Sequence, residues 1–237
     1  MTNFLTANWA DIVMANYAVP PEILQPYLPK GVEIDLFEGK SYVSLVGFMF
    51  LKTRIFGMKI PILGDFEEVN LRFYVKRIVS GEVRRGVVFI NETVPNKLVA
   101  WVANFLYKEH YIAIPTKHNI KRFPTEQHIV YEWKNGKQWS KIGIKTEVQT
   151  KEMPENSAQE FIFEHYFGYT KTSATATEEY EVKHERWRTN EVLSHMIDCD
   201  FGAVYGSVFA ILNTTKPENV FYTQGSSVAV AWQRERF

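Results

Sequence analysis

The fold of this chain is decided by Phe66-Glu67-Glu68-Val69-Asn70-Leu71-Arg72-Phe73-Tyr74-Val75, which alternates polar and apolar residues as a β-strand does. Side chains two residues apart on a strand point the same way, so Glu68, Asn70 and Arg72 share one face. The apolar residues between them share the other face. The polar face is either solvated, as on an antiparallel sheet, or it lines an enclosed cavity inside a barrel.

The composition favours a large core, and the formal net charge of zero gives no overall attraction to a charged partner. The chain has 237 residues, 46% of them hydrophobic and 15% aromatic, which suits one β-rich domain over residues 1–237. Lys plus Arg and Asp plus Glu number 27 each, so we predict neither nucleic acid nor membrane as a partner. The N-terminus lacks a signal-peptide pattern, and no apolar run approaches the roughly 20 residues that span a bilayer. We therefore predict a cytoplasmic protein.

Cys199 is the single cysteine, which excludes an intrachain disulfide and a zinc site built from cysteines. It stands between Asp198 and Asp200, whose negative charges raise a thiol pKa and oppose a nucleophilic role. We interpret Cys199 as a small buried apolar residue.

Turn residues divide much of the chain into pairs of strands. The segments 32–36 and 42–48 flank a four-residue turn with Gly39, and 67–79 and 84–94 flank Gly81. Asn135-Gly136, a favoured hairpin turn, joins 129–133 to 141–149. Further strands are expected over residues 9–17, 111–114, 178–188, 204–212 and 220–232.

Helices are expected to be few and short. Pro21 opens one over 21–28, Asn96 caps one with apolar residues at three- and four-residue steps, and Ser157 or Asn156 caps a third ending at Phe163. Residues 54–64 and 171–177 are expected to be loops. The pattern predicts a large, mainly β structure with minor α content.

Several segments spread over nearly the whole chain resemble the YqjF-like family of uncharacterised bacterial proteins, which is placed in the acetoacetate-decarboxylase-like superfamily. They are Val19-Pro20-Pro21-Glu22-Ile23-Leu24-Gln25-Pro26-Tyr27-Leu28-Pro29-Lys30-Gly31, Glu68-Val69-Asn70-Leu71-Arg72, Glu164-His165-Tyr166-Phe167-Gly168-Tyr169-Thr170, His184-Glu185-Arg186-Trp187 and Tyr222-Thr223-Gln224-Gly225-Ser226. The resemblance implies a single antiparallel, barrel-like or cone-shaped sheet around a central cavity, with short helices outside.

The decarboxylase reaction does not follow from this resemblance. Acetoacetate decarboxylases form a Schiff base between a lysine and the ketone of a β-keto acid, with a second lysine adjacent. The corresponding region here is 107–117, where Lys108 and Lys117 each stand alone. An ordinary lysine, with a pKa of about 10.4, is almost fully charged at neutral pH and needs a nearby cation or apolar pocket to react. We name Lys108 and Lys117 as candidate imine formers and His110 as the candidate for proton transfer.

Arg72 is the strongest candidate for holding a ligand. A guanidinium inside a barrel keeps its charge, so it needs a carboxylate partner or an anionic ligand. Glu68 and Asn70 share its face and are expected to position it, and the alternative is a surface Arg72–Glu68 pair of little energetic value. The other candidate ligand-binding residues are Tyr111, His165, Tyr166, His184 and Trp187.

No cofactor or metal is predicted. The chain has neither a phosphate-binding glycine loop nor a dinucleotide fingerprint, and Ser226 lacks the Gly-x-Ser-x-Gly context of a hydrolase. His110, His165 and His184 show no recognised metal-ligand spacing.

The sequence thus predicts a small-molecule-binding protein or enzyme that acts on a compact organic acid, keto acids included, in a central cavity. An enzyme of this kind would be lyase-like or decarboxylase-like. The alternatives are a non-catalytic binding or sensing protein with the same cavity, and a structural module whose cavity is filled by side chains. Homo-oligomerisation is left open.

Overall fold

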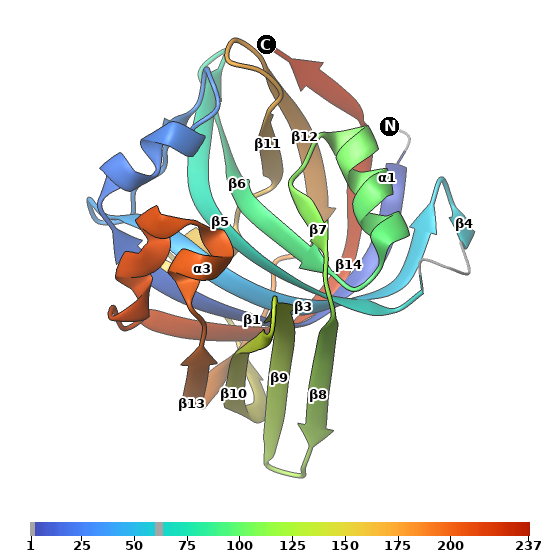
Figure 1. Ribbon diagram of the computed structural model, residues 1–237, viewed down its shortest axis with the longest axis vertical. Coiled ribbons are helices and arrows are strands. Elements are labelled where there is room, and N and C mark those ends of the chain that lie inside the picture. Colours follow the sequence, from blue (N-terminus) through green and yellow to red (C-terminus); the bar gives the residue numbers. More distant parts are fainter. Residues whose placement is uncertain (1–2, 60–63) are drawn as a thin grey trace.

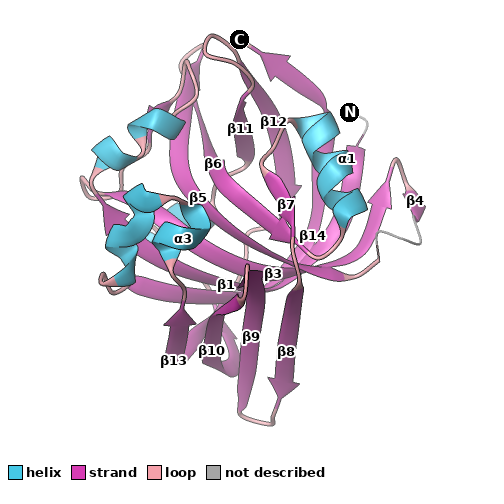
Figure 2. Ribbon diagram, viewed as in Figure 1, coloured by secondary structure: helices cyan, strands magenta, loops and turns pink. Residues whose placement is uncertain are grey.

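The computed structural model describes residues 3–59 and 64–237, and it is mainly β, with 61% strand and 14% helix (Figure 2). The strands are β1 (Asn3–Val19), β2 (Glu33–Ile34), β3 (Ser41–Ile55), β4 (Met58–Lys59), β5 (Phe66–Val79), β6 (Glu82–Val94), β7 (Tyr111–Ala113), β8 (Thr116–Arg122), β9 (Glu126–Asn135), β10 (Gln138–Lys151), β11 (Phe167–Lys171), β12 (Thr177–His184), β13 (Thr189–Asp198) and β14 (Asn219–Arg236). The α-helices are α1 (Lys97–Tyr107), α2 (Ala158–Phe163) and α3 (Phe201–Tyr205), and the 3-10 helices are η1 (Pro21–Ile23), η2 (Gln25–Tyr27) and η4 (Ser207–Asn213). In the described ranges, no helix has the length and apolar character needed to cross a membrane.

Seven strands close into a barrel. Their order is β1-β3-β5-β6-β11-β12-β14, and β14 pairs with β1 to complete the ring (Figure 1). The predicted barrel is therefore confirmed, but the expectation of a purely antiparallel sheet is wrong. β11 and β7 both run parallel to β6. Each returns to β6 after an intervening helix, and a connection longer than a hairpin permits parallel pairing.

A second layer of strands covers part of the outside of the barrel. β13, β10, β9 and β8 continue the sheet from β14 and extend below the barrel in the view of Figure 1. The apolar face of β5 is buried beneath this layer, where Leu71 and Phe73 belong to the same core as Tyr131 and Trp133 of β9. β5 is thus buried on both faces, so the solvated alternative for its polar row is wrong.

Most of the local predictions are confirmed. The 67–79 and 84–94 segments form the β5–β6 hairpin, and Asn135-Gly136 turns between β9 and β10, with Gly136 at a φ of 58°. The Asn96 side chain accepts a hydrogen bond from the Leu98 amide at 2.8 Å, and Ser157 accepts one from the Glu160 amide at 3.2 Å. These caps satisfy amides that have no partner within the helix.

The hairpin predicted between 32–36 and 42–48 is wrong. β2 pairs with β5 instead, placing Glu33 opposite Lys76. The buried Asp35 explains this docking. Its amide donates to the Tyr74 carbonyl at 3.0 Å, and its carboxylate lies 3.1 Å from Arg85 Nε and 3.8 Å from Lys76 Nζ.

The strand predicted over 204–212 is also wrong, because this segment belongs to α3 and η4. Phe201, Tyr205, Phe209 and Leu212 recur at helical steps of three and four residues, and all four are buried. Asp200 begins α3 by accepting a hydrogen bond from the Ala203 amide at 3.1 Å. Strands β8, β11 and β13 were not predicted.

The segment 54–64, which was expected to be a loop, contains a short β-hairpin between β3 and β4. Arg54 pairs with Lys59 and Ile55 with Met58, with Phe56 and Gly57 at the turn. Residues 60–63 of the expected loop lie outside the described residues.

Candidate functional site

The barrel encloses a cavity of about 130 Å³. This size is close to the roughly 150 Å³ of an engineered apolar cavity that binds benzene. The interior is therefore not filled by side chains, and the filled-cavity alternative is wrong. Most of the wall is apolar, and its aromatic rings include those of Trp9, Phe48, Phe50, Phe66, Phe89 and Trp187.

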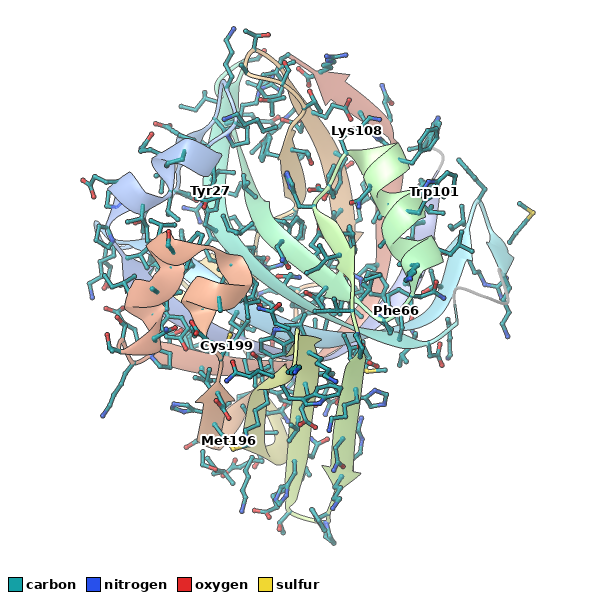
Figure 3. The ribbon with its side chains drawn as sticks, viewed as in Figure 1. Tyr27, Phe66, Trp101, Lys108, Met196 and Cys199 are labelled. Atoms are coloured by element: carbon teal, nitrogen blue, oxygen red, sulfur yellow. The ribbon has the colours of Figure 1, made fainter. Side chains whose placement is uncertain are left out.

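Helix α1 closes one side of the cavity. Val99, Val102 and Ala103 line the interior, while Trp101 on the same helix is 62% exposed (Figure 3). The three- and four-residue spacing of the inward residues is the helical stripe expected from the sequence.

Polar side chains gather where β5, β6 and β7 run side by side. Glu68, Asn70 and Arg72 of β5 all line the cavity, as the alternation predicts. Asn70 lies opposite Glu92 of β6, and Glu92 lies opposite Tyr111 of β7. Neighbours across strands have Cβ atoms about 5 Å apart, so an amide, a carboxyl and a phenol form one row across the sheet.

Glu68 is held by two hydrogen bonds. Asn70 Nδ2 donates to Glu68 Oε1 at 2.9 Å, and the Tyr111 hydroxyl donates to Glu68 Oε2 at 3.0 Å. Glu68 is buried, and so is Asn70. The carboxyl is therefore fixed in position on the cavity wall.

A third carboxyl, that of Glu109, enters the cavity from the connection between α1 and β7. The preceding residue, Lys108, has a left-handed backbone with φ of 56°, and this turn directs Glu109 inward. Thr170 Oγ1 donates to Glu109 Oε1 at 2.5 Å, and the Tyr180 hydroxyl donates to the same oxygen at 2.8 Å.

Burial favours the protonated form of all three carboxyls. It raises the pKa of Glu68 to about 7, against the opposing effect of the hydrogen bonds from Asn70 and Tyr111 and of the Arg72 charge. It likewise raises the pKa of Glu109 to about 7. Burial, with the charges of Glu109 and Glu68 added, raises the pKa of Glu92 well above its usual value. The site thus contains carboxyls that exchange protons near neutral pH.

Arg72 lies beside these carboxyls without an ion pair to them. Its Nη2 donates to the Met14 sulfur at 3.6 Å, and the guanidinium carbon is 5.8 Å from the centre of the Tyr74 ring. The buried Nε has no hydrogen-bond acceptor among the described residues. The expected pairing of Arg72 with Glu68 is therefore not formed.

His165 lines the cavity next to Arg72 and is held neutral by its surroundings. Burial lowers the pKa of His165 to about 4, although Asp35 opposes this effect from 3.6 Å. The ring packs against Tyr74 and Phe161, with ring centres 4.8 and 5.2 Å away. Neither ring nitrogen has a hydrogen-bond partner in the described part of the chain.

The three residues named as catalytic candidates lie away from the cavity wall. Lys108 follows α1 with an exposed side chain (Figure 3), and His110 is exposed beside it. His110 contributes its backbone carbonyl, which accepts a hydrogen bond from the Glu92 amide at 3.1 Å. Lys117 on β8 pairs with Glu132 at 3.2 Å. Among the described residues, no lysine lines the cavity.

The remaining predicted residues form an aromatic stack that leads outward from the cavity. Trp187 lines the cavity and stacks on His184, with ring centres 4.2 Å apart, and His184 stacks on Tyr166 at 4.7 Å. Trp187 Nε1 donates to Ser226 Oγ at 2.8 Å. His184 and Tyr166 do not line the cavity themselves.

Glu92, Glu109 and Tyr180 belong to the site but were not predicted. The alternation does not predict Glu92 because Ile90 is an extra residue in β6, so Phe89 and Glu92 both face the cavity although they are three positions apart. A period of two cannot reveal such a bulge. The position of Glu109 between Lys108 and His110, two candidate residues, was the available signal for it.

A closed seven-stranded barrel around an apolar cavity with a cluster of ionisable side chains defines the acetoacetate-decarboxylase-like fold class. Residues 6–227 match the profile of the DUF2071 family, described as "Uncharacterized conserved protein (COG2071)", and the chain belongs to this family. The "Uncharacterized protein YqjF" of Bacillus subtilis (strain 168) is 34% identical over 68 residues, which is 28% of this chain and 28% of that protein. The matched stretch therefore spans less than a third of this curated relative. The resemblance found in the sequence is confirmed.

Solved structures agree on the fold. An acetoacetate decarboxylase-like enzyme from Sphingomonas wittichii RW1 is 11% identical, with a TM-score of 0.66, over 100% of this chain and 94% of its own. The enduracididine biosynthesis enzyme MppR complexed with pyruvate is 11% identical, with a TM-score of 0.64, over 100% of this chain and 91% of its own. Acetoacetate decarboxylase from Legionella pneumophila is 10% identical, with a TM-score of 0.64, over 98% of this chain and 86% of its own. At these identities the likeness concerns the fold alone.

Proposed function

We propose that the barrel cavity binds a compact organic acid whose carboxylate is held by Arg72. The observation that carries this proposal is the Arg72 side chain on the cavity wall, whose buried Nε has no acceptor among the described residues. The guanidinium stays charged, so an anionic ligand supplies the partner that the described residues do not. The aromatic wall then accommodates the apolar part of the acid.

Catalysis at this site, where it occurs, proceeds by proton transfer rather than through an imine. The absence of a lysine from the described cavity wall supports this. Glu68 has a pKa of about 7 and is fixed by Asn70 and Tyr111, the properties of a general acid or base near neutral pH. With a keto acid, the Glu68 carboxylate would take a proton from the carbon beside the carbonyl, and a proton returned to the oxygen would give the enol.

The rival proposal is a non-catalytic binding or sensing protein that uses the same cavity. It requires the same contact between Arg72 and the ligand carboxylate. It does not require Glu68 to accept or release a proton. Turnover of a bound acid, or exchange of its protons with solvent deuterium, separates the two. A Glu68→Gln variant that binds the acid and loses the exchange supports the enzyme.

The test of binding is calorimetric titration with a panel of compact acids that includes pyruvate, propanoate and butyrate. Arg72→Met should lower the affinity for each binding acid by about tenfold or more, because hydrogen bonds to charged groups contribute roughly 1.5–3 kcal/mol. Arg188→Met is the matched control, since Arg188 is exposed and pairs with Glu152 on the surface. Equal affinity in wild type and Arg72→Met overturns the proposal.

A further inference from the structure

Two buried oxygen atoms on neighbouring strands of the cavity wall have no hydrogen-bond partner among the described residues. These are Asn70 Oδ1 and Glu92 Oε2. Asn70 is 1% exposed and Glu92 is 2% exposed, so both lie away from the outer surface of the protein. A buried acceptor without a donor is costly, and such groups often mark a place where a ligand completes the network.

The two acceptors are direct neighbours. Asn70 and Glu92 face each other across β5 and β6, and both side chains line the cavity. The donors that surround them are already used. Asn70 Nδ2 and the Tyr111 hydroxyl donate to Glu68, and the Thr170 and Tyr180 hydroxyls donate to Glu109. These described donors are therefore not available to the pair, and a ligand can supply one.

The charges at the site favour a cationic donor. Three buried carboxyls face the cavity, while Arg72 is the one permanent cation on its described wall and His165 is neutral there. The titratable and charged groups around the acceptor pair are Glu68, Glu109, Tyr111, Tyr180, Arg72 and His165. A positive group placed among the carboxyls stabilises their ionised forms, which burial otherwise disfavours.

We infer that the ligand of this cavity is a compact amino acid or a similar zwitterion, whose ammonium group donates to Asn70 Oδ1 and Glu92 Oε2 while its carboxylate binds Arg72. This inference rests on the proposed function for the carboxylate. It adds a second anchoring point at the Asn70–Glu92 pair and names the class of ligand.

The spacing of the two anchors suits a small molecule. Arg72 and Asn70 are two residues apart on β5, and a strand advances about 3.3 Å per residue, so their Cα atoms are about 7 Å apart. Because the Arg72 side chain is flexible, its guanidinium can lie closer to the acceptor pair than the two Cα atoms lie to each other. A ligand with a few bonds between its ammonium and carboxylate groups spans this separation.

The experiment compares matched probes on the whole protein. Calorimetry would measure the binding of butyrate, of butylamine, and of α-, β- and γ-aminobutyrate. We expect at least one aminobutyrate to bind about tenfold or more tightly than butyrate, because it makes charge-assisted hydrogen bonds at both ends. Titration in buffers of different ionisation enthalpy should also show proton release with the aminobutyrate and not with butyrate.

Variants separate the two proposals. Glu92→Gln keeps the shape of the side chain and removes its charge, so it should abolish the roughly tenfold preference for the aminobutyrate over butyrate. Arg72→Met should weaken both ligands. If butyrate binds through Arg72 and the amine adds no affinity, the zwitterion inference is wrong and the proposed function stands. If none of the probes binds to the wild type, both are wrong.

Burial keeps Glu92 protonated without a ligand, so a ligand that does not displace this proton would leave Glu92 able to donate to Asn70 Oδ1. In that case Glu92→Gln, whose amide also donates, would bind each aminobutyrate as tightly as the wild type does. That result would overturn the inference, and thermal melting of the variant would verify that it is folded.

Discussion

Asn104 of α1 and Tyr111 of β7 join the cover of the cavity to its carboxyl cluster. Asn104 Nδ2 donates to the backbone carbonyl of Tyr111, and Asn104 Oδ1 accepts from the backbone N–H of Tyr111, both at 2.8 Å. The hydroxyl of the same tyrosine donates to Glu68 at 3.0 Å. A movement of α1 is therefore transmitted to the carboxyl that we propose as the acid or base.

Replacing Asn104 by alanine should loosen this connection. Each of the two lost hydrogen bonds contributes about 1 kcal/mol, so amides of α1 should exchange with deuterium about tenfold faster or more. Ligand affinity should fall as well, because Tyr111 is less firmly placed. Lys97→Ala, on the exposed side of the same helix, is the control. Exchange rates in α1 that match those of the wild type would contradict the link.

The buried carboxyls make a distinct prediction about pH and stability. The folded protein keeps a proton on Glu92 that the unfolded chain releases above a pH of about 4.5, so stability falls as pH rises from there through the folded pKa. His165, with a pKa of about 4, acts in the opposite direction between about 4 and 6.5.

Comparison with Glu92→Gln removes the His165 contribution, because both proteins contain that histidine. The variant and wild type should melt at similar temperatures near pH 5. The variant should become the more stable protein toward pH 9, and the difference should grow as pH rises. Calorimetric melting across this range provides the measurement, with Glu152→Gln on the surface as the control. Parallel stability curves for Glu92→Gln and the wild type would exclude a protonated Glu92.

Lysine chemistry can be tested directly. Borohydride treatment in the presence of pyruvate or acetoacetate should leave Lys108 and Lys117 without an adduct, because both are exposed and outside the cavity wall. The Lys117 ammonium is also engaged by Glu132 and lies 4.5 Å from the centre of the Trp139 ring. Peptide mass spectrometry detects the adduct, and an acetoacetate decarboxylase is the positive control. Specific trapping at either lysine would restore the imine mechanism.

The sequence predicts a site residue correctly only where its strand keeps the regular two-residue alternation of side chains. This alternation holds on β5, where it correctly places Glu68, Asn70 and Arg72 on one face. It fails on β6, where the bulge at Ile90 brings Glu92 inward, and at the left-handed Lys108, which directs Glu109 into the cavity. Both features are single-residue departures from regular backbone, and they are decided by packing between distant segments.

The same reasoning applies to the fold. Turn residues predicted the β5–β6 and β9–β10 hairpins because both strands of each pair lie next to the turn. They failed for 32–36, since the buried Asp35 docks this segment on β5 through ionic contacts with Lys76 and Arg85. Parallel pairing of β11 with β6 joins segments about 80 residues apart and has no local signal.

Asp11 ties the barrel to the outer strands and should be among the most sensitive positions for stability. Its carboxylate accepts hydrogen bonds from Arg122 of β8 at 3.0 and 2.9 Å and from the Tyr222 hydroxyl of β14 at 2.8 Å. Its carbonyl accepts from the Tyr131 hydroxyl of β9 at 2.8 Å. Asp11 also has a left-handed backbone, with φ of 53°, at the irregularity in the β1–β3 pairing.

Asp11→Ala should therefore destabilise the protein by on the order of 2–4 kcal/mol, because the buried Tyr222 hydroxyl loses its acceptor and alanine tolerates the left-handed conformation poorly. Asp11→Asn should cost less, since asparagine adopts this conformation readily and its amide oxygen still accepts hydrogen bonds. Urea unfolding of the two variants measures both values. Because Asp11 lies outside the cavity wall, folded Asp11→Asn should bind the same acids as the wild type. An alanine variant within 0.5 kcal/mol of wild type would show that the barrel and the outer layer are held together by their shared apolar core alone.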